Sequence, residues 1–282
     1  MLILVVAAIC FAGSAQATPG GISGTGLTLW LDAGTITGMN DGQAFVSGDS
    51  WADSSGNNYD ASFSLGAPAY VASSLNGQAA VSFDGASQFN YAGAIGASGA
   101  DDWTIFIVMK QTGDGSTNDR TFHFGDQTTL TGGASVSLDT SQGSGIGPRY
   151  NNGNKIFNEV LGLDTYRIAA LQMPTGGSYN SVDYWRDGTA GTVKGNGGAN
   201  TTNLVDEGYT LGGQNFGGGS LGYLTGDIAE LIMYDRVLTA GELNTVGYYL
   251  EDKYALDTAY VPEPTTMALL GLGSLVLIRR KK

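Results

Sequence analysis

Short runs in which apolar and polar residues alternate, separated by glycine-rich turns, fill most of the chain from Gly26 onward. The 282 residues include 45 glycines, about twice the usual share of roughly 7%. At 42% hydrophobic and 10% aromatic residues, the chain has too much apolar material to be disordered. Alternation favours strands that bury one face, and Gly, Asn and Asp favour tight turns between them. The sequence therefore predicts an all-β body of many short strands.

Six runs are the clearest strand candidates: 27–31, 79–83, 103–110, 165–173, 181–186 and 227–234. Asp187 and Gly188 follow one of these runs and predict a hairpin turn, because both residue types tolerate positive φ. One segment, 238–254, departs from the β pattern. It begins with a capping box of Thr239 and Glu242, after which apolar residues recur at helical spacing. We expect a single amphipathic helix there.

Four stretches carry a family resemblance: 29–33 (LWLDA), 51–58 (WADSSGNN), 81–85 (VSFDG) and 226–236 (GDIAELIMYDR). In this order, and followed by the capped helix, they resemble bacterial laminin-G-like domains of the concanavalin A-like jelly-roll class. The resemblance implies two antiparallel sheets packed face to face, with Phe83, Trp103 and Ile228 near the core. We expect one such domain over 20–258. The fold implies no single activity, because it serves binding proteins and enzymes alike.

The N-terminus predicts export. An apolar stretch over 2–12 precedes Ala15 and Ala17, which form the small-x-small pattern of a secretory cleavage site. We therefore expect residues 1–17 to be a signal peptide, although its start lacks Lys and Arg, and a buried N-terminal strand is the alternative. The one cysteine, Cys10, lies in this segment, so cleavage after Ala17 would leave a chain without disulfides.

The C-terminal segment, 261–282, has three parts in order. Pro262, Glu263 and Pro264 come first, an apolar run over 265–278 follows, and a basic end contains Arg279, Arg280, Lys281 and Lys282. As a helix, the apolar run would span about 21 Å, against roughly 30 Å of hydrocarbon in a bilayer. We expect this short hydrophobic helix to enter the membrane with its basic end on the cytoplasmic side.

These three parts closely resemble the PEP-CTERM sorting signal. The resemblance implies that Pro262, Glu263 and Pro264 are recognised by exosortase-type sorting machinery in a Gram-negative bacterium. It also implies that membrane insertion is transient and that the protein reaches the cell envelope, the outer surface or the extracellular matrix. A permanent short anchor formed by 265–278 is the alternative.

Charge argues against some partners. The formal net charge is −13, and it becomes −17 once the four basic residues at the very end are removed, because nine basic residues then face 26 acidic ones. Such a body repels phosphate backbones, which excludes nucleic acid as a partner.

The residues also argue against catalysis. The single histidine, His123, alternates with Phe122 and Phe124, and we expect it at the surface or rim, pointing away from both rings. Jelly-roll glucanases carry Glu-x-Asp-x-x-Glu on one strand, whereas Asp227 and Glu230 are three apart and are expected on opposite faces. We therefore expect no enzyme; a glycosidase or lyase with another carboxylate pair is the alternative.

Two further patterns concern ligands. Asp53 and Asn57 place oxygen atoms as at the start of a calcium loop, although a tight Asx turn explains the same residues. The jelly-roll resemblance also implies a structural calcium somewhere in the domain. Tyrosines in glycine- and asparagine-rich segments offer material for sugar contacts: Tyr59, Tyr70, Tyr91, Tyr150 and Tyr223. The sequence thus predicts a secreted, non-catalytic surface or biofilm-matrix protein that contacts exopolysaccharide or other glycans.

Overall fold

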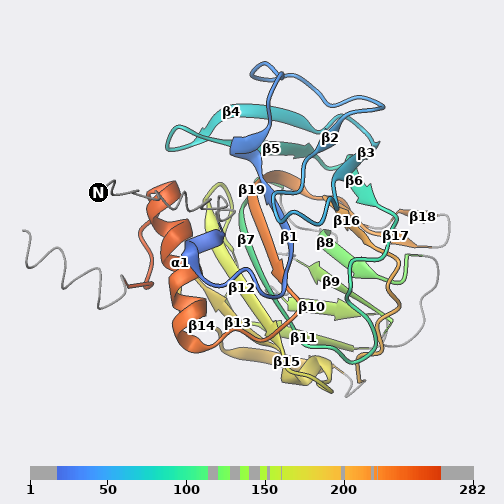
Figure 1. The fold of residues 1–282 in the computed structure, drawn as a ribbon, viewed down its shortest axis with the longest axis vertical. Helices are drawn as coiled ribbons and strands as arrows, with labels where there is room; N and C mark the ends of the chain where they lie inside the picture. The colour runs from blue at the N-terminus through green and yellow to red at the C-terminus, as the bar shows by residue number, and fades with distance from the viewer. Residues whose placement is uncertain are drawn as a thin grey trace, which may run out of the picture.

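The computed structural model describes residues 18–113, 120–127, 134–139, 147–150, 153–159, 161–197, 201–216, 219–220 and 222–261. Within them the chain forms two large antiparallel sheets and one α-helix, α1 (Ala240–Tyr254), as Figure 1 shows. Three short 3-10 turns accompany them, η1 (Pro19–Gly21), η2 (Ala33–Thr35) and η3 (Tyr179–Ser181). In this described part, no helix has the length and apolar character needed to cross a membrane.

The first sheet has eight strands in the order β14-β13-β12-β7-β19-β5-β4, with β1 beside β19. Its strands are β1 (Leu27–Asp32), β4 (Ala69–Leu75), β5 (Gln78–Asp84), β7 (Trp103–Gln111), β12 (Arg167–Met173), β13 (Asp183–Arg186), β14 (Thr189–Ala190) and β19 (Thr225–Tyr234). One side of β19 pairs first with β5 and then with β1, and its other side pairs with β7. All six predicted strands lie in this sheet, with ends shifted by one or two residues.

The second sheet has nine strands in the order β15-β11-β10-β9-β8-β16-β6-β3-β2. They are β2 (Ser50–Trp51), β3 (Ala61–Leu65), β6 (Gln88–Tyr91), β8 (Arg120–Gly125), β9 (Ser135–Asp139), β10 (Gly147–Tyr150), β11 (Gly153–Phe157), β15 (Val193–Gly197) and β16 (Tyr209–Leu211). A separate pair consists of β17 (Asn215–Phe216) and β18 (Gly219–Ser220). The two packed antiparallel sheets confirm the predicted sandwich.

The core between the sheets is rich in aromatic rings. Phe89 is fully buried and makes edge-to-face contacts with Phe45, Trp51 and Phe83, with ring centroids 4.9 to 6.5 Å apart. Burying one such side chain contributes about 1.5–3 kcal/mol to folding. Phe83, Trp103 and Ile228 are all at most 2% exposed, which confirms their predicted place in the core.

Helix α1 covers the opposite face of the eight-stranded sheet. Its buried residues Leu243, Val246, Leu250 and Tyr254 form a second apolar cluster with alternate residues of β7 and β19. Both faces of these two strands are therefore covered, which explains why their sequences are almost continuously apolar. The predicted helix is confirmed, including the capping box at Thr239 and Glu242.

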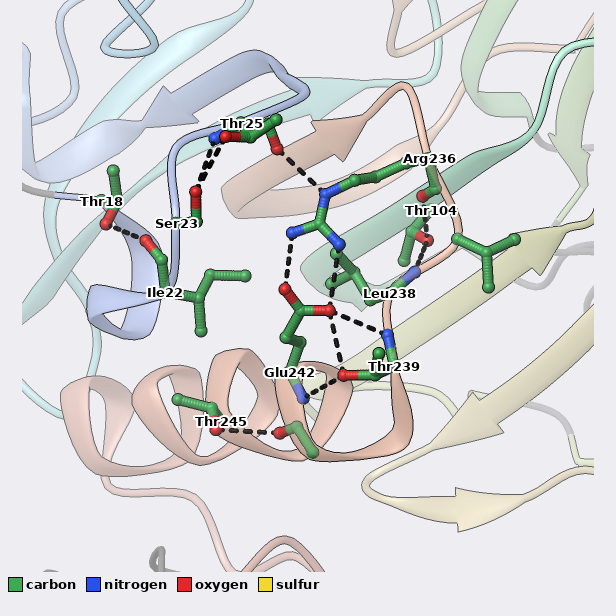
Figure 2. A network of polar contacts seen from close by, with 12 residues as sticks. Thr18, Ile22, Ser23, Thr25, Thr104, Arg236, Leu238, Thr239, Glu242 and Thr245 are labelled. Carbon is green, nitrogen blue, oxygen red and sulfur yellow. Dashed lines mark hydrogen bonds and ion pairs between the residues drawn. The ribbon is translucent and has the colours of Figure 1, made fainter.

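A polar network fixes the start of α1, as Figure 2 shows. Glu242 accepts hydrogen bonds from the Thr239 backbone nitrogen at 2.9 Å and from two nitrogens of Arg236 at 2.7 and 2.9 Å. Arg236 also donates to the carbonyl oxygen of Thr25, so the network joins the segment before β1 to the helix. The hydrogen bonds from Arg236 are the largest influence that lowers the pKa of Glu242 to about 2.

Candidate functional site

A row of polar residues crosses the outer face of the nine-stranded sheet, the face turned away from the core. Strand pairing aligns Ser62 with Asn90, Asn90 with Thr210, Thr210 with His123, and His123 with Ser137. We call these five residues the outer row. Their strand neighbours, such as Phe89, Phe122 and Leu211, point into the core. Strict alternation thus produces the row from five separate strands.

The outer row passes from open to covered. Ser62 is exposed and Asn90 is half-buried, whereas Thr210, His123 and Ser137 are at most 1% exposed. Part of the cover is the turn that follows β16. Thr210 Oγ1 donates to the carbonyl oxygen of Gly213 at 2.9 Å, and Gln214 Nε2 donates to His123 Nδ1 at 3.0 Å.

His123 is fully buried, so its predicted place at the surface or rim is wrong, although it does point away from Phe122 and Phe124. The Asp126 carbonyl oxygen, 3.1 Å from Nε2, can only accept, so Nε2 carries the proton and Nδ1 accepts. Burial lowers the pKa of His123 to about 4 and keeps the imidazole neutral. Alternation gave the correct face of the strand but could not reveal what covers that face.

Ser137 Oγ lies 2.9 Å from His123 Nδ1, and a serine next to an imidazole raises the question of nucleophilic catalysis. Both residues are inaccessible to solvent, and the far ring nitrogen bonds a backbone carbonyl in place of a carboxylate. The pair therefore holds β8 and β9 together in this conformation.

A pocket of about 390 Å³ opens beside the exposed end of the outer row. It is lined by Asn90, Tyr91, Ala92, Gln127, Asp206, Glu207, Tyr209 and Thr210. The Tyr91 ring stacks on Tyr209, with ring centroids 5.9 Å apart, and lies 5.2 Å from the ring of Tyr59. Its volume is within the usual range of small-molecule sites, roughly 300–1,000 Å³.

Two carboxylates, those of Asp206 and Glu207, belong to the polar lining of the pocket. Asp206 accepts from the backbone nitrogens of Ile95 and Gly96, both at 2.7 Å, and Glu207 accepts from that of Gln127 at 2.9 Å. The side-chain nitrogen of Gln127 donates a hydrogen bond to the Gly125 carbonyl. The buried Oε1 atom of the same side chain has no hydrogen-bond partner. No lysine or arginine is among the lining residues. The pocket is therefore acidic and suited to ligands that donate hydrogen bonds.

Asp227 and Glu230 lie on one face of β19, which corrects the expectation that they point to opposite faces. A register shift between Ile228 and Glu230, relative to β7, marks a β-bulge that restores the alternation after three residues. Asp227 bonds Lys110 at 2.7 Å, Tyr166 at 2.9 Å and Ser74 at 3.0 Å. Burial raises the pKa of Asp227, but the hydrogen bonds from Lys110 and Tyr166 outweigh it, so the pKa is lowered.

Glu230 belongs to a buried cluster beneath α1. Lys253 Nζ lies 2.6 Å from both Glu230 and Asp32, and Glu230 also accepts from Trp30 at 2.6 Å and Tyr254 at 2.8 Å. Burial raises the pKa of Glu230 despite the charge of Lys253. Because Glu230 has no exposed surface, the carboxylate docks the helix and faces no cleft.

The calcium candidates form a loop that is closed by hydrogen bonds. Asp53 accepts from the backbone nitrogens of Trp30, Ser55 and Tyr59 and from the Ser55 hydroxyl, at 2.7 to 3.0 Å. Asn57 Nδ2 donates to the carbonyls of Leu27 and Thr28, both at 2.9 Å. The bond from the Ser55 nitrogen to Asp53 is the tight Asx turn that the sequence offered as the other explanation, and calcium binding by Asp53 and Asn57 stays a prediction. Within the described ranges, no group of three or more His, Cys, Asp or Glu side chains could hold a metal.

The remaining predicted site residues fall into two groups. Of the tyrosines, Tyr59, Tyr70 and Tyr91 pack against the core, and Tyr91 is also a lining residue of the pocket. Tyr223 lies outside the strands, and Tyr150 lies in β10. The export and sorting residues lie outside the described residues: Ala15, Ala17, Pro262, Glu263, Pro264, Arg279 and Arg280. Sequence reasoning missed Asn90, Gln127, Asp206 and Glu207, because only the fold brings these distant positions together.

Comparison with solved structures shows the same kind of fold. One similar structure is domain 4 of AbnA, a GH43 extracellular arabinanase from Geobacillus stearothermophilus, solved in complex with arabinotriose. It is 16% identical to this chain with a TM-score of 0.52, and the match covers 79% of this chain and 97% of that domain. A sialidase from Trypanosoma rangeli is 14% identical with a TM-score of 0.52, and the match covers 81% of this chain and 33% of the sialidase. At such identities the likeness shows the fold alone. A comparison with curated proteins gives no match.

A family model matches the end of the chain. It describes the PEP-CTERM protein-sorting motif, and the matched residues are 261–282, the three-part segment singled out above. The motif marks an exported protein associated with the cell envelope. The chain thus joins a two-sheet β-sandwich body to a C-terminal PEP-CTERM protein-sorting motif.

Proposed function

We propose that this chain is a non-catalytic protein of the cell surface or biofilm matrix of a Gram-negative bacterium, and that its body binds glycans. A signal peptide at 1–17 would start export. Exosortase-type machinery would recognise Pro262, Glu263 and Pro264 while the apolar run, 265–278, is in the membrane. The matched sorting motif supports the route, and the acidic pocket supports the binding role.

The observation that carries the binding proposal is the lining of the pocket. The carboxylates of Asp206 and Glu207 belong to a lining that has no lysine or arginine. Sugar hydroxyls and the ammonium group of an amino sugar are donors that match such oxygens. A uronic or sialic acid would instead bring a carboxylate into an acidic pocket of an acidic protein. We therefore assign the pocket to neutral or amino sugars.

Glycan-array binding followed by calorimetry tests this assignment. We expect binding to neutral or de-N-acetylated oligosaccharides, weaker by about tenfold in Glu207→Gln, because a hydrogen bond to a charged group is worth about 1.5–3 kcal/mol. Glu159→Gln is a matched control, since the carboxylate of Glu159 bonds Thr192 and is not part of the pocket. Absence of binding to any glycan, with or without calcium, would refute the proposal.

The absence of catalysis is part of the proposal. The carboxylates of Asp227 and Glu230 are held by Lys110 and Lys253 and lie on the face that α1 covers, away from the pocket. A glycosidase needs two carboxyl groups across the sugar, roughly 5–9.5 Å apart, with one of them protonated. Chromatography of the bound oligosaccharide after long incubation should recover it intact, and shortened products would favour the enzyme.

A further inference from the structure

The last described residues, 256–261, dock on the body, and we call them the strap. The side chain of Asn244 in α1 makes two hydrogen bonds to the end of the strap. Its Nδ2 atom donates to the Val261 carbonyl at 2.7 Å, and its Oδ1 atom accepts from the Val261 nitrogen at 3.1 Å. Further back, the Ala259 nitrogen donates to the carbonyl of Asp187 at 2.8 Å. The strap is thus tied to α1 and to the β13–β14 hairpin.

Two glycines make room for the strap. Tyr260 is 5% exposed, and a β-carbon at Gly247 of α1 would collide with its ring. Gly188 has φ of 77° in the hairpin turn, and a β-carbon there would lie 2.8 Å from the Tyr260 nitrogen. A helix interior with glycine is about 1 kcal/mol less favourable than one with alanine. This chain therefore carries a less favourable residue in α1 at the position that accepts Tyr260.

The strap ends where the sorting motif begins. Val261 is the first residue of the matched motif, and the apolar run starts at Thr265. The four peptide units between these residues reach at most roughly 14 Å, even when fully extended. With the apolar run in the membrane, as in the proposed sorting, a docked strap would hold the folded body within that distance of the bilayer. A sorting protease would have to work in this gap.

We propose that the strap is a releasable spacer that limits the rate of sorting. When it leaves α1, its six residues add roughly 20 Å of extended chain between body and membrane. Processing then occurs from the undocked state, so the strength of docking sets the rate. Asn244, Gly247 and Tyr260 are positioning residues in this scheme, since they act through the accessibility of the motif.

Rates of tail removal in the native host, measured by mass spectrometry of the C-terminus, test the proposal. Asn244→Ala removes two hydrogen bonds and should raise the rate about tenfold. Gly247→Ala should also accelerate removal, because it expels Tyr260 although alanine favours the helix. The matched control is Asp252→Ala, an exposed position of the same helix, which should leave the rate unchanged.

A second arm separates spacing from general destabilisation. Six Gly/Ser residues inserted between Val261 and Pro262 should accelerate removal and make it insensitive to Asn244→Ala. Hydrogen exchange at Tyr260 in the purified full chain should be faster in both docking variants.

The outcomes distinguish this inference from the proposed function on which it rests. If wild-type chains lose the tail but neither docking variant is faster, or either is slower, the strap does not limit sorting. If no chain loses its tail, the proposed sorting fails and the strap has no such role.

Discussion

Burial of a single side chain, His123, makes the stability of this sandwich depend on pH. The imidazole is enclosed on the outer face of the nine-stranded sheet, where Gln214 and Ser137 both contact Nδ1. Burial lowers its pKa from 6.5 to about 4. Between pH 6.5 and 4 the imidazole is protonated in the unfolded chain but neutral in the folded chain. The free energy of unfolding therefore falls as the pH falls through this range.

We expect wild-type protein to lose up to about 3 kcal/mol of unfolding free energy between pH 6.5 and 4 through this one group. Urea denaturation at several pH values measures the loss. His123→Asn should be less stable at pH 7 but lack this part of the pH dependence. The sequence has one histidine, which makes the assignment direct. Parallel curves for the two proteins would contradict it.

At the scale of elements, docking of α1 depends on charge as well as on apolar contact. Lys253 forms ion pairs with both Glu230 and Asp32 at the edge of an apolar cluster, and the Glu230 carboxylate is completely buried. Removing one partner of a buried ion pair is far more costly than replacing both. Lys253 therefore anchors α1 to the sheet, because Glu230 of β19 and Asp32 of β1 would be left without a cation if it were removed.

Lys253→Met should lower the unfolding free energy by roughly 3–5 kcal/mol, because it leaves buried carboxylates without their cation. Adding Glu230→Gln should recover part of this loss, and a double-mutant cycle in urea measures the coupling. Asp252→Ala, next in sequence but exposed, should stay within about 0.5 kcal/mol of wild type. Additive effects of the two substitutions would show that the pair is not coupled.

Elements with a strong local pattern could be predicted from the sequence, and short ones could not. The central strands β7 and β19 are long apolar runs, and α1 has a capping box. Two-residue strands such as β2 and β14 exist only because neighbouring chain segments pair with them. The bulge in β19 likewise depends on its partner β7, so the common face of Asp227 and Glu230 could not be inferred from their spacing.

At the scale of the whole molecule, the two ends of the body lie on one side and the pocket lies on the other sheet. The turn η1 packs against α1, and the strap ends on the same helix. Figure 1 shows α1 beside the eight-stranded sheet, opposite β16 and β8 of the sheet that carries the pocket. A chain held at its C-terminus would therefore present the pocket away from the point of attachment.

Residues 18–261 contain every contact described above, and we expect them to fold alone. Thermal unfolding of this fragment should match that of the full chain within a few degrees. A fragment that ends at residue 255 lacks Tyr260, so it should unfold at a lower temperature, since burying a large side chain contributes about 1.5–3 kcal/mol. Equal midpoints for the two fragments would mean that the strap adds nothing to stability.

The pairing of β1 with β19 determines how the body would respond to mechanical tension. Leu27 at the start of β1 is paired with Tyr234 at the end of β19, so both strands leave the ladder at the same end. Tension between the two ends of the body would first detach the strap and α1. The hydrogen bonds between β1 and β19 would then break one after another, starting at Leu27 and Tyr234. Because they do not share the load, β1 would separate at low force. The body therefore has little resistance to a force applied between its two ends. Attachment through the C-terminal end alone would not load this pair of strands.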